Sequence, residues 1–224
     1  IVSKIKKLKN EVTIAVVGKY IDLKDAYKSL HEALYHASFH NNLKLKINYI
    51  DSEDLEKGQP KNLLSDCDGI LVPGGFGNRG FEGKISAIKY AREKNIPFFG
   101  ICLGLQMAVV EFARNVCNIK NANSRESGRK IKDFVIDIMD HQKDLDTKGG
   151  NMRLGDYPCE IKKSTRVSEA YKKNKISERH RHRYEVNPKY HSVLTKNGLV
   201  LSGLSPDGKL AETIEIKEHP WFVA

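Results

Sequence analysis

The sequence of 224 residues contains no long uninterrupted apolar run, so it predicts no transmembrane helix. Its first residues, 1–11, are basic and have no apolar centre, so we expect no signal peptide in them. Only four cysteines are present, and no two of them form a C-x-x-C pair. We therefore expect a reduced, cytoplasmic protein without a zinc site or any other bound metal.

Acidic residues are in the minority: 28 Asp and Glu stand against 38 Lys and Arg, which gives a formal net charge of +10. Such a charge can indicate a nucleic-acid-binding protein. However, the lysines are spread along the chain, and no basic stripe is interleaved with aromatic residues. Basic residues are denser in two places. The first is Lys4–Lys9, which is typical of an interdomain linker. The second contains Arg179, Arg181 and Arg183, which are suited to binding a small anion or to forming an interface. We expect no nucleic-acid partner and no membrane partner.

Strand-like apolar runs alternate with helical patterns in the first half of the chain. The strands are expected at Val12–Val17, Leu45–Ile50, Ile70–Val72 and Phe98–Ile101, and the helices at Asp25–Asn41, Phe81–Lys94 and from Leu103 onward. Alternation at this spacing predicts an α/β fold with a doubly wound, mostly parallel sheet.

The second half of the chain has a different character. Polar and Gly-containing segments, including a loop at Asp140–Gly150, separate short strand candidates. These are Phe134–Met139, Tyr157–Ile161, Arg183–Val186, Leu199–Gly203, Leu210–Ile216 and Trp221–Val223, with a helical turn at Ser168–Lys173. The pattern predicts antiparallel strands that extend one edge of the parallel sheet, within a single domain.

The segment Pro97–Gln106 reads as a buried strand that ends at Cys102 and continues as a helix. Gly100 and Gly104 flank the cysteine, and G-x-C-x-G is the spacing of a nucleophile elbow. The start of a helix favours a thiolate, and the N–H of Leu103 would point at an oxyanion formed by attack of Cys102. The alternative is a small buried cysteine in a strand–helix turn.

A glycine-rich loop, Pro73–Gly77, follows the preceding strand. Ligands of parallel sheets bind at the carboxyl ends of strands, so this loop and Cys102 should lie at the same edge. Its backbone can offer a second N–H to an oxyanion. A phosphate-binding loop is the weaker interpretation, because no G-x-x-x-x-G-K-[ST] pattern is present.

The loop and the elbow together resemble class I (triad-type) glutamine amidotransferases, and further segments resemble the glutaminase domain of CTP synthase. These segments are Val17–Tyr20, Asp25–Leu30, Phe76–Gly80, Asn121–Ser124, Gly149–Gly155, Glu178–Asn187 and His219–Val223. The resemblance covers nearly the whole chain and implies a flavodoxin-like fold. It implies an interdomain linker remnant at 1–11 and a glutamine amidotransferase domain at 12–224 whose C-terminal end is truncated.

The resemblance also implies the site residues. Cys102 is the nucleophile that attacks the side-chain amide of L-glutamine, and the N–H groups of Gly75 and Leu103 form the oxyanion hole. L-Glutamine binding is implied for Gly75, Phe76, Leu103, Gly104, Leu105, Gln106, Glu126 and Arg183.

Two of these residues carry charges that suit an amino acid: Glu126 for its α-ammonium and Arg183 for its α-carboxylate. Apart from the resemblance, Glu126 reads as an ordinary loop charge and Arg183 as a salt-bridge residue. Gln106, one helical turn after Cys102, reads as helix surface.

No cofactor is implied for this domain. The resemblance places ATP, UTP and Mg²⁺ in an N-terminal synthetase domain that aminates UTP to CTP, absent from this sequence. It implies GTP as an allosteric activator, with Arg79 and Arg153 as candidate residues, and a homotetramer as the full-length enzyme.

This sequence departs from the pattern of the family at the catalytic base. In the relatives, the segment that resembles His219–Ala224 is followed by Q-F-H-P-E, which supplies the triad His and Glu. We assign the triad His and Glu to no residue of this sequence. His180 and His182 belong to another motif, so we do not assign either histidine as the base. We expect very low activity, and the alternative is a non-catalytic glutamine-binding or regulatory fragment.

A further alternative is the glutaminase of another amidotransferase, such as that of GMP synthesis. The motif from Arg179 to Asn187 argues against it.

Overall fold

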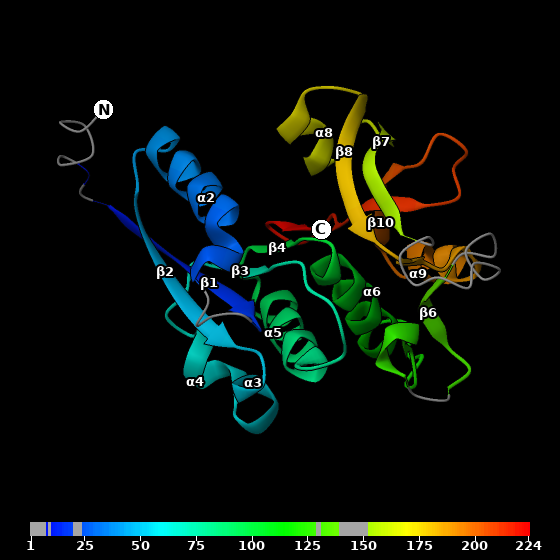
Figure 1. Ribbon diagram of the computed structural model, residues 1–224, viewed down its shortest axis with the longest axis horizontal. Coiled ribbons are helices and arrows are strands. Elements are labelled where there is room, and N and C mark those ends of the chain that lie inside the picture. The colour runs from blue at the N-terminus through cyan, green and yellow to red at the C-terminus, as the bar shows by residue number, and fades with distance from the viewer. Residues whose placement is uncertain (1–7, 9, 20–23, 129–130, 139–151) are drawn as a thin grey trace.

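The computed structural model describes residues 8, 10–19, 24–128, 131–138 and 152–224 (Figure 1). These residues form a nine-stranded sheet in the order β2-β1-β3-β4-β12-β11-β10-β7-β8. Its first five strands are parallel: β1 (Glu11–Gly18), β2 (Lys44–Asp51), β3 (Gly69–Val72), β4 (Phe98–Gly100) and β12 (Phe222–Val223).

Helices cover both faces of the parallel part (Figure 1). One face carries α2 (Lys28–His40), which follows the 3-10 turn η1 (Lys24–Tyr27). The other face carries α3 (Asp54–Lys57), α4 (Pro60–Leu64), α5 (Phe81–Lys94) and α6 (Leu103–Asn115). All residues of β3 are buried, as expected for a strand covered on both faces. The predicted doubly wound sheet is confirmed.

An antiparallel extension begins at β12, which pairs in parallel with β4 and antiparallel with β11. The strands that follow are β11 (Ala211–Ile216), β10 (Leu199–Leu204), β7 (Arg153–Ile161) and β8 (Lys175–His182). The connections contain α8 (Arg166–Tyr171), η3 (Pro188–Tyr190) and α9 (His191–Lys196). The expected extension of the sheet is therefore confirmed.

Two of the expected edge strands lie elsewhere. A separate three-stranded sheet contains β5 (Asn123–Ser124), β6 (Phe134–Ile138) and β9 (Tyr184–Val186), with η2 (Arg125–Ser127) after β5. The placement of all second-half strands at one sheet edge is thus wrong for β6 and β9. Val135, Ile136 and Val186 are buried in the same apolar cluster as α6, and this burial holds the small sheet against that helix.

Other boundaries differ from the sequence-based expectation. β8 was not predicted at all, and Glu11 belongs to β1 rather than to the linker. The expected loop at Asp140–Gly150 and most of the linker lie outside the described residues.

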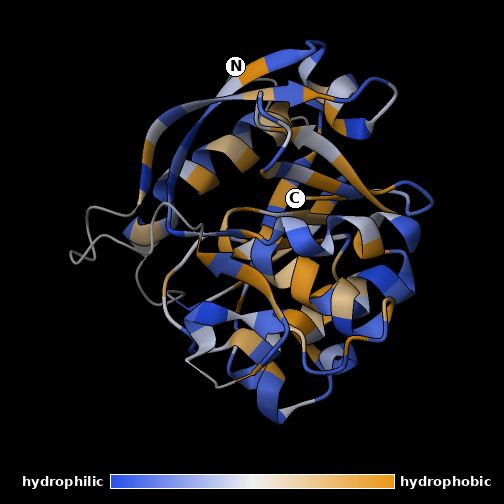
Figure 2. Cartoon of the chain, turned by 90° about the vertical axis from the view of Figure 1, so that its right-hand side faces the viewer, coloured by the Kyte–Doolittle hydropathy of each residue, from blue (hydrophilic) through white to orange (hydrophobic). Residues whose placement is uncertain are grey.

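The apolar core lies between the sheet and the helices that cover it, and Figure 2 shows the apolar residues gathered inside, with hydrophilic outer faces. The rings of Phe98 and Phe222 stack with centroids 4.5 Å apart and join β4 to β12. Met107 on α6 is 0% exposed. Burial of each such side chain contributes about 1.5–3 kcal/mol, so the core fixes β4 and α6, between which Cys102 lies.

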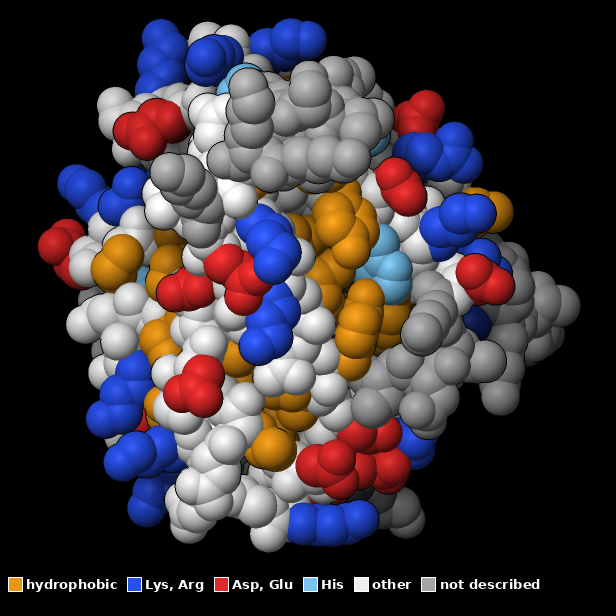
Figure 3. Space-filling model, turned by 90° about the vertical axis from the view of Figure 1, so that its left-hand side faces the viewer, with side chains coloured by type: hydrophobic (Ala, Val, Ile, Leu, Met, Phe, Trp, Pro, Cys, Tyr) orange, Lys and Arg blue, Asp and Glu red, His pale blue; other side chains and the backbone are white. Residues whose placement is uncertain are grey.

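Charged side chains of both signs are interspersed on the face shown in Figure 3, and the basic residues there form no continuous stripe. Across the part of the chain that the structure describes, no helix combines the length and the apolar character needed to cross a membrane.

Candidate active site

Cys102 occupies a strained position between β4 and α6. It is the N-cap residue of α6 and has φ 53° and ψ −100°, a conformation that L side chains rarely adopt. Such strain persists only where the surrounding structure enforces it, and it occurs frequently at active sites. The backbone thus has the sharp strand-to-helix turn of a nucleophile elbow.

The two glycines that flank the elbow are required by close packing. A Cβ atom on Gly104 would lie 2.2 Å from the backbone oxygen of Val72 on β3. A Cβ atom on Gly100 would lie 2.8 Å from Cβ of Ala224 and 2.9 Å from the backbone carbon of Gly104. Only glycine fits at either position, which explains the G-x-C-x-G spacing physically.

The glycine-rich loop after β3 lies against this elbow, as predicted from the order of the strands. A Cβ atom built on Gly74 would be 3.6 Å from Cβ of Cys102, and one on Gly75 would be 3.4 Å from Cδ2 of Leu103. Leu103 is the first residue of α6, where backbone N–H groups have no partner within the helix. The loop and the helix start therefore face the same space beside the thiol.

A pocket of about 320 Å³ opens at this point. It brings together six of the residues predicted from the sequence, together with four others. The predicted residues are Gly75, Phe76, Cys102, Gln106, Glu126 and Arg183, and the others are Met152, Arg181, His182 and Tyr184. Pockets of this size hold small metabolites.

The remaining predicted residues lie around the elbow rather than in this pocket. Leu103 is 1% exposed, so its side chain belongs to the core. Gly104 packs on β3, as described above. Leu105 lines a second cavity of about 420 Å³, which shares with the first the residues Cys102, Gln106, Arg181, His182 and Tyr184.

Two predicted polar residues already have protein partners. The Nε2 of Gln106 donates to the backbone oxygen of Tyr184 at 2.9 Å, and Gln106 is only 5% exposed. Oε1 of Glu126 accepts from the backbone N–H of Gly77 at 2.6 Å. The interpretation of Gln106 as helix surface is wrong, because this side chain ties α6 to β9.

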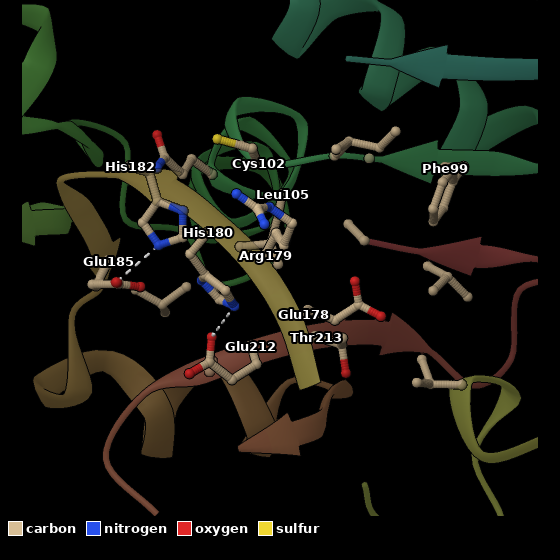
Figure 4. Close-up of a pocket in the computed structure, with 18 of the residues that line it drawn as sticks. Phe99, Cys102, Leu105, Glu178, Arg179, His180, His182, Glu185, Glu212 and Thr213 are labelled. Atoms are coloured by element: carbon tan, nitrogen blue, oxygen red, sulfur yellow. Dashed lines mark hydrogen bonds and ion pairs between the residues drawn. The ribbon is translucent and has the colours of Figure 1, made fainter. Parts of the chain in front are cut away.

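Sequence reasoning set His182 aside, whereas the structure places it at the nucleophile. Its imidazole lies between Cys102 and Glu185 (Figure 4), with Nε2 2.9 Å from Oε1 of Glu185. The local spacing of His180, His182 and Glu185 gave no signal for this contact, because it depends on the pairing of β8 with β7. His180 instead points at Glu212, with 3.6 Å between Nε2 and Oε2.

The two arginines considered for GTP-dependent activation are engaged with carboxylates. Arg153 is 7% exposed and pairs with Glu185 at 3.0 Å and with Glu212 at 2.8 Å. Arg79 is more exposed and pairs with Glu53 at 3.0 Å. The buried position of Arg153 gives it a structural role beneath the site.

Metal-binding side chains do not cluster in the described ranges: His, Cys, Asp and Glu residues there form no group of three or more that could hold a metal ion. The pocket contains the thiol of Cys102, the imidazole of His182 and the charged side chains of Glu126, Arg181 and Arg183.

The chain was compared with known proteins. The family model "Glutamine amidotransferase class-I" matches residues 22–224. CTP synthase of Clostridium acetobutylicum is 55% identical over 222 residues, which are 99% of this chain and 42% of that protein. CTP synthase of Methanocaldococcus jannaschii is 55% identical over 221 residues, 96% of this chain and 41% of the relative. The chain thus spans about two-fifths of the length of these relatives.

Among solved structures, the chain resembles the glutaminase domain of Trypanosoma brucei CTPS, which was solved with bound acivicin. The TM-score is 0.88 at 41% sequence identity, and the match covers 95% of this chain and 84% of that one. The order of the strands, the elbow cysteine and these similarities agree, and the chain belongs to the class I glutamine amidotransferases, among the glutaminase domains of the CTP synthase family.

Proposed function

We propose that this protein hydrolyses L-glutamine and supplies the released ammonia for the amination of UTP to CTP. One observation carries the proposal: the strained Cys102 opens onto a pocket shared with Gly75, Glu126 and Arg183. Hydrolysis of an amino-acid amide by a cysteine needs a nucleophile, oxyanion donors and groups that hold both charges of the amino acid. The pocket contains residues of each kind.

In the first half of the proposed reaction, Sγ of Cys102 bonds to the side-chain amide carbon of glutamine. The carbonyl oxygen becomes an oxyanion, to which the N–H groups of Gly75 and Leu103 donate. Loss of one such donor costs about 3 kcal/mol of transition-state stabilisation. The C–N bond then breaks, the nitrogen takes up the proton that the thiol gave up and leaves as ammonia, and a thioester remains. Water hydrolyses the thioester to glutamate and restores the thiol.

The substrate headgroup is proposed to lie between Glu126 and Arg183, with the α-ammonium near the carboxylate and the α-carboxylate near the guanidinium. Phe76, whose residue surface is 49% exposed, forms a side wall. Gln106 completes the wall next to the amide, and Gly104 and Leu105 support it from the first turn of α6.

The proposal for the whole protein extends beyond the present chain. We assign ATP, UTP and Mg²⁺ to an N-terminal synthetase domain, GTP to an activating role, and a tetramer to the full-length enzyme. Residues 1–11 are proposed as the connection to that domain and 12–224 as the glutaminase domain, which needs no cofactor for thiol chemistry. The four cysteines are free thiols, which fits a reducing cytoplasm.

The test uses 6-diazo-5-oxo-norleucine, which alkylates glutamine sites, followed by intact-mass measurement and peptide mapping. We expect one adduct on Cys102, its suppression by excess glutamine, and ammonia release from glutamine that a Cys102→Ala variant lacks. A folded protein that gains no adduct and releases no ammonia would refute the proposal. If glutamine nevertheless raised the Tm of that protein, the glutamine-binding or regulatory module would be the correct assignment.

A further inference from the structure

Glu126, the residue proposed to hold the α-ammonium of glutamine, belongs to the short 3-10 turn η2. Its Oε1 accepts from the N–H of Gly77 at 2.6 Å, and Nδ2 of Asn78 donates to the backbone oxygen of Ser127 at 3.2 Å. The turn thus contacts the glycine-rich loop at two points. A group that fixes η2 therefore fixes both a carboxylate of the substrate pocket and the loop beside Cys102.

The residue before Glu126 anchors this turn. Nε of Arg125 donates to Oδ1 of Asp137 on β6, and Nη2 of Arg125 donates to Oδ2 of Asp137 at 3.0 Å. The guanidinium carbon also lies 4.2 Å from the centre of the Phe134 ring. Two parallel hydrogen bonds and a ring contact hold the planar guanidinium in one orientation, which a single ammonium contact would not do.

The acceptor of these bonds is itself held in place. Oδ1 of Asp137 also accepts from the N–H of Ile138 at 2.7 Å, and the side chain of Asp137 is only 13% exposed. In the small sheet, Ile138 pairs with Tyr184 of β9. Tyr184 lines the pocket of Cys102, and its backbone oxygen accepts from Gln106. Through β6, the anchor of η2 is therefore part of the same framework as another wall of the pocket.

We propose that Arg125, through its ion pair with Asp137, positions Glu126 for the α-ammonium of glutamine. Arg125 and Asp137 are positioning residues, because they act through Glu126. The inference rests on the proposed function, in which Glu126 holds this ammonium. The attraction between two charges depends on their separation. A turn without its anchor would hold the Glu126 carboxylate at several separations, and ordering the turn on binding would weaken the affinity for glutamine.

A stabilising role and a positioning role predict different effects. The side chain of Arg125 is 42% exposed, and ion pairs of exposed side chains contribute little to stability. Removal of the pair should therefore leave the protein folded with a nearly unchanged urea midpoint. Glu126 is proposed to contact the headgroup rather than the reacting amide, so its displacement should reduce the affinity for glutamine more than kcat.

The experiment measures the Kd of glutamine by isothermal titration calorimetry in a Cys102→Ala background, which cannot turn the substrate over. The variants are Arg125→Gln, Asp137→Asn and the double variant, and the matched control is Lys175→Gln, which removes an exposed ion pair with Glu160. We expect each single variant to raise the Kd about 5- to 10-fold, and the double variant to lie within about 2-fold of the singles, because all three remove the same interaction. The control should stay within about 2-fold of the background.

Two results would overturn the proposal. One is a Kd unchanged by Asp137→Asn, since Arg125 would then not act through this carboxylate. The other is a pair of single effects that multiply in the double variant, which would mean that the two side chains act independently.

A second measurement needs no ligand. Hydrogen exchange at the N–H of Gly77, followed by NMR, reports its hydrogen bond to Glu126. We expect exchange about 10-fold faster in Arg125→Gln and Asp137→Asn than in the wild type, and unchanged in Lys175→Gln. Equal exchange rates in all four proteins would contradict the proposal. A protein that bound no glutamine would refute the proposed function, whereas the exchange rates would still decide whether Arg125 holds Glu126 in place.

Discussion

Nζ of Lys19 lies 2.7 Å from the backbone oxygen of Phe76 and also donates to that of Gly77. Lys19 follows β1, whereas the loop follows β3, so one ammonium joins two neighbouring strand ends. On its other side, the N–H of Gly77 donates to Glu126 at 2.6 Å. The peptide units 76–77 and 77–78, which follow Gly75 in the loop, are thus held by a cation on their oxygens and a carboxylate on one N–H group.

The first prediction is that Lys19→Met lowers the glutaminase turnover rate roughly 10- to 100-fold, because the loop no longer holds its N–H donor in position for the oxyanion. The change should appear mainly in kcat, with little effect on KM. Steady-state ammonia release measures it, and Lys61→Met, an exposed lysine on α4, is the control. Unchanged kcat in a folded Lys19→Met variant would show that the position of the loop does not depend on the hydrogen bonds from Lys19.

The second prediction contrasts two glycines near the nucleophile. In Gly104→Ala, the new methyl group would meet the Val72 oxygen at 2.2 Å, and a backbone atom cannot move aside cheaply. We expect a loss of about 3 kcal/mol or more in the free energy of unfolding. In Gly74→Ala, the methyl group would lie 3.6 Å from Cβ of Cys102, an ordinary contact, and the loss should stay below about 1 kcal/mol. Urea denaturation compares both variants, and equal losses would contradict the packing argument.

The parallel half of the fold could be predicted from local patterns. The predicted helix Phe81–Lys94 has the observed bounds of α5, because its apolar spacing is flanked by two residues in the left-handed conformation, Gly80 with φ 70° and Asn95 with φ 55°. The elbow at Cys102 was predictable for a similar reason. Close packing around it permits only glycine at two positions, and that requirement leaves a readable spacing in the sequence.

β8 and the partner of Cys102 could not be predicted in the same way. The segment Lys175–His182 contains one apolar residue, Ile176, and is an edge strand in which charged side chains are tolerated. Its strand character comes from pairing with β7, across many residues of sequence. The contact between His182 and Cys102 depends on that register, so residue type and local spacing do not reveal it.

A third prediction concerns the buried arginine beneath the site. Arg153→Met would leave Glu185 and Glu212 without their shared guanidinium, and both side chains are only 4% exposed. Removing one partner of a buried ion pair costs about 3–5 kcal/mol. We expect a lower urea midpoint at pH 7 and a smaller loss at pH 5, where the carboxyl groups can take up protons. A variant as stable as the wild type would mean that the two carboxylates find other partners.

The last prediction begins from Lys84, which lies 1% exposed under the first turn of α5. Its Nζ donates to Oγ of Ser52 at 2.8 Å and to the backbone oxygen of Gly80 at 3.2 Å. Burial, reinforced by the nearby charge of Lys19, lowers the pKa of Lys84 from 10.5 to about 7. The folded state therefore releases this proton near neutral pH, whereas the unfolded chain keeps it up to about pH 10.

Between pH 7 and 10 the unfolded state binds more protons at Lys84 than the folded state, so the free energy of unfolding must rise with pH in this window. Below pH 7 both states are protonated, and the buried charge lowers stability by a constant amount. We expect the wild type to gain roughly 2 kcal/mol from pH 7 to 9 relative to Lys84→Met. Urea denaturation at pH 6, 7, 8 and 9 measures this, with Lys61→Met expected to keep the wild-type slope. Parallel stability curves for wild type and Lys84→Met would show that Lys84 keeps its proton in the folded protein.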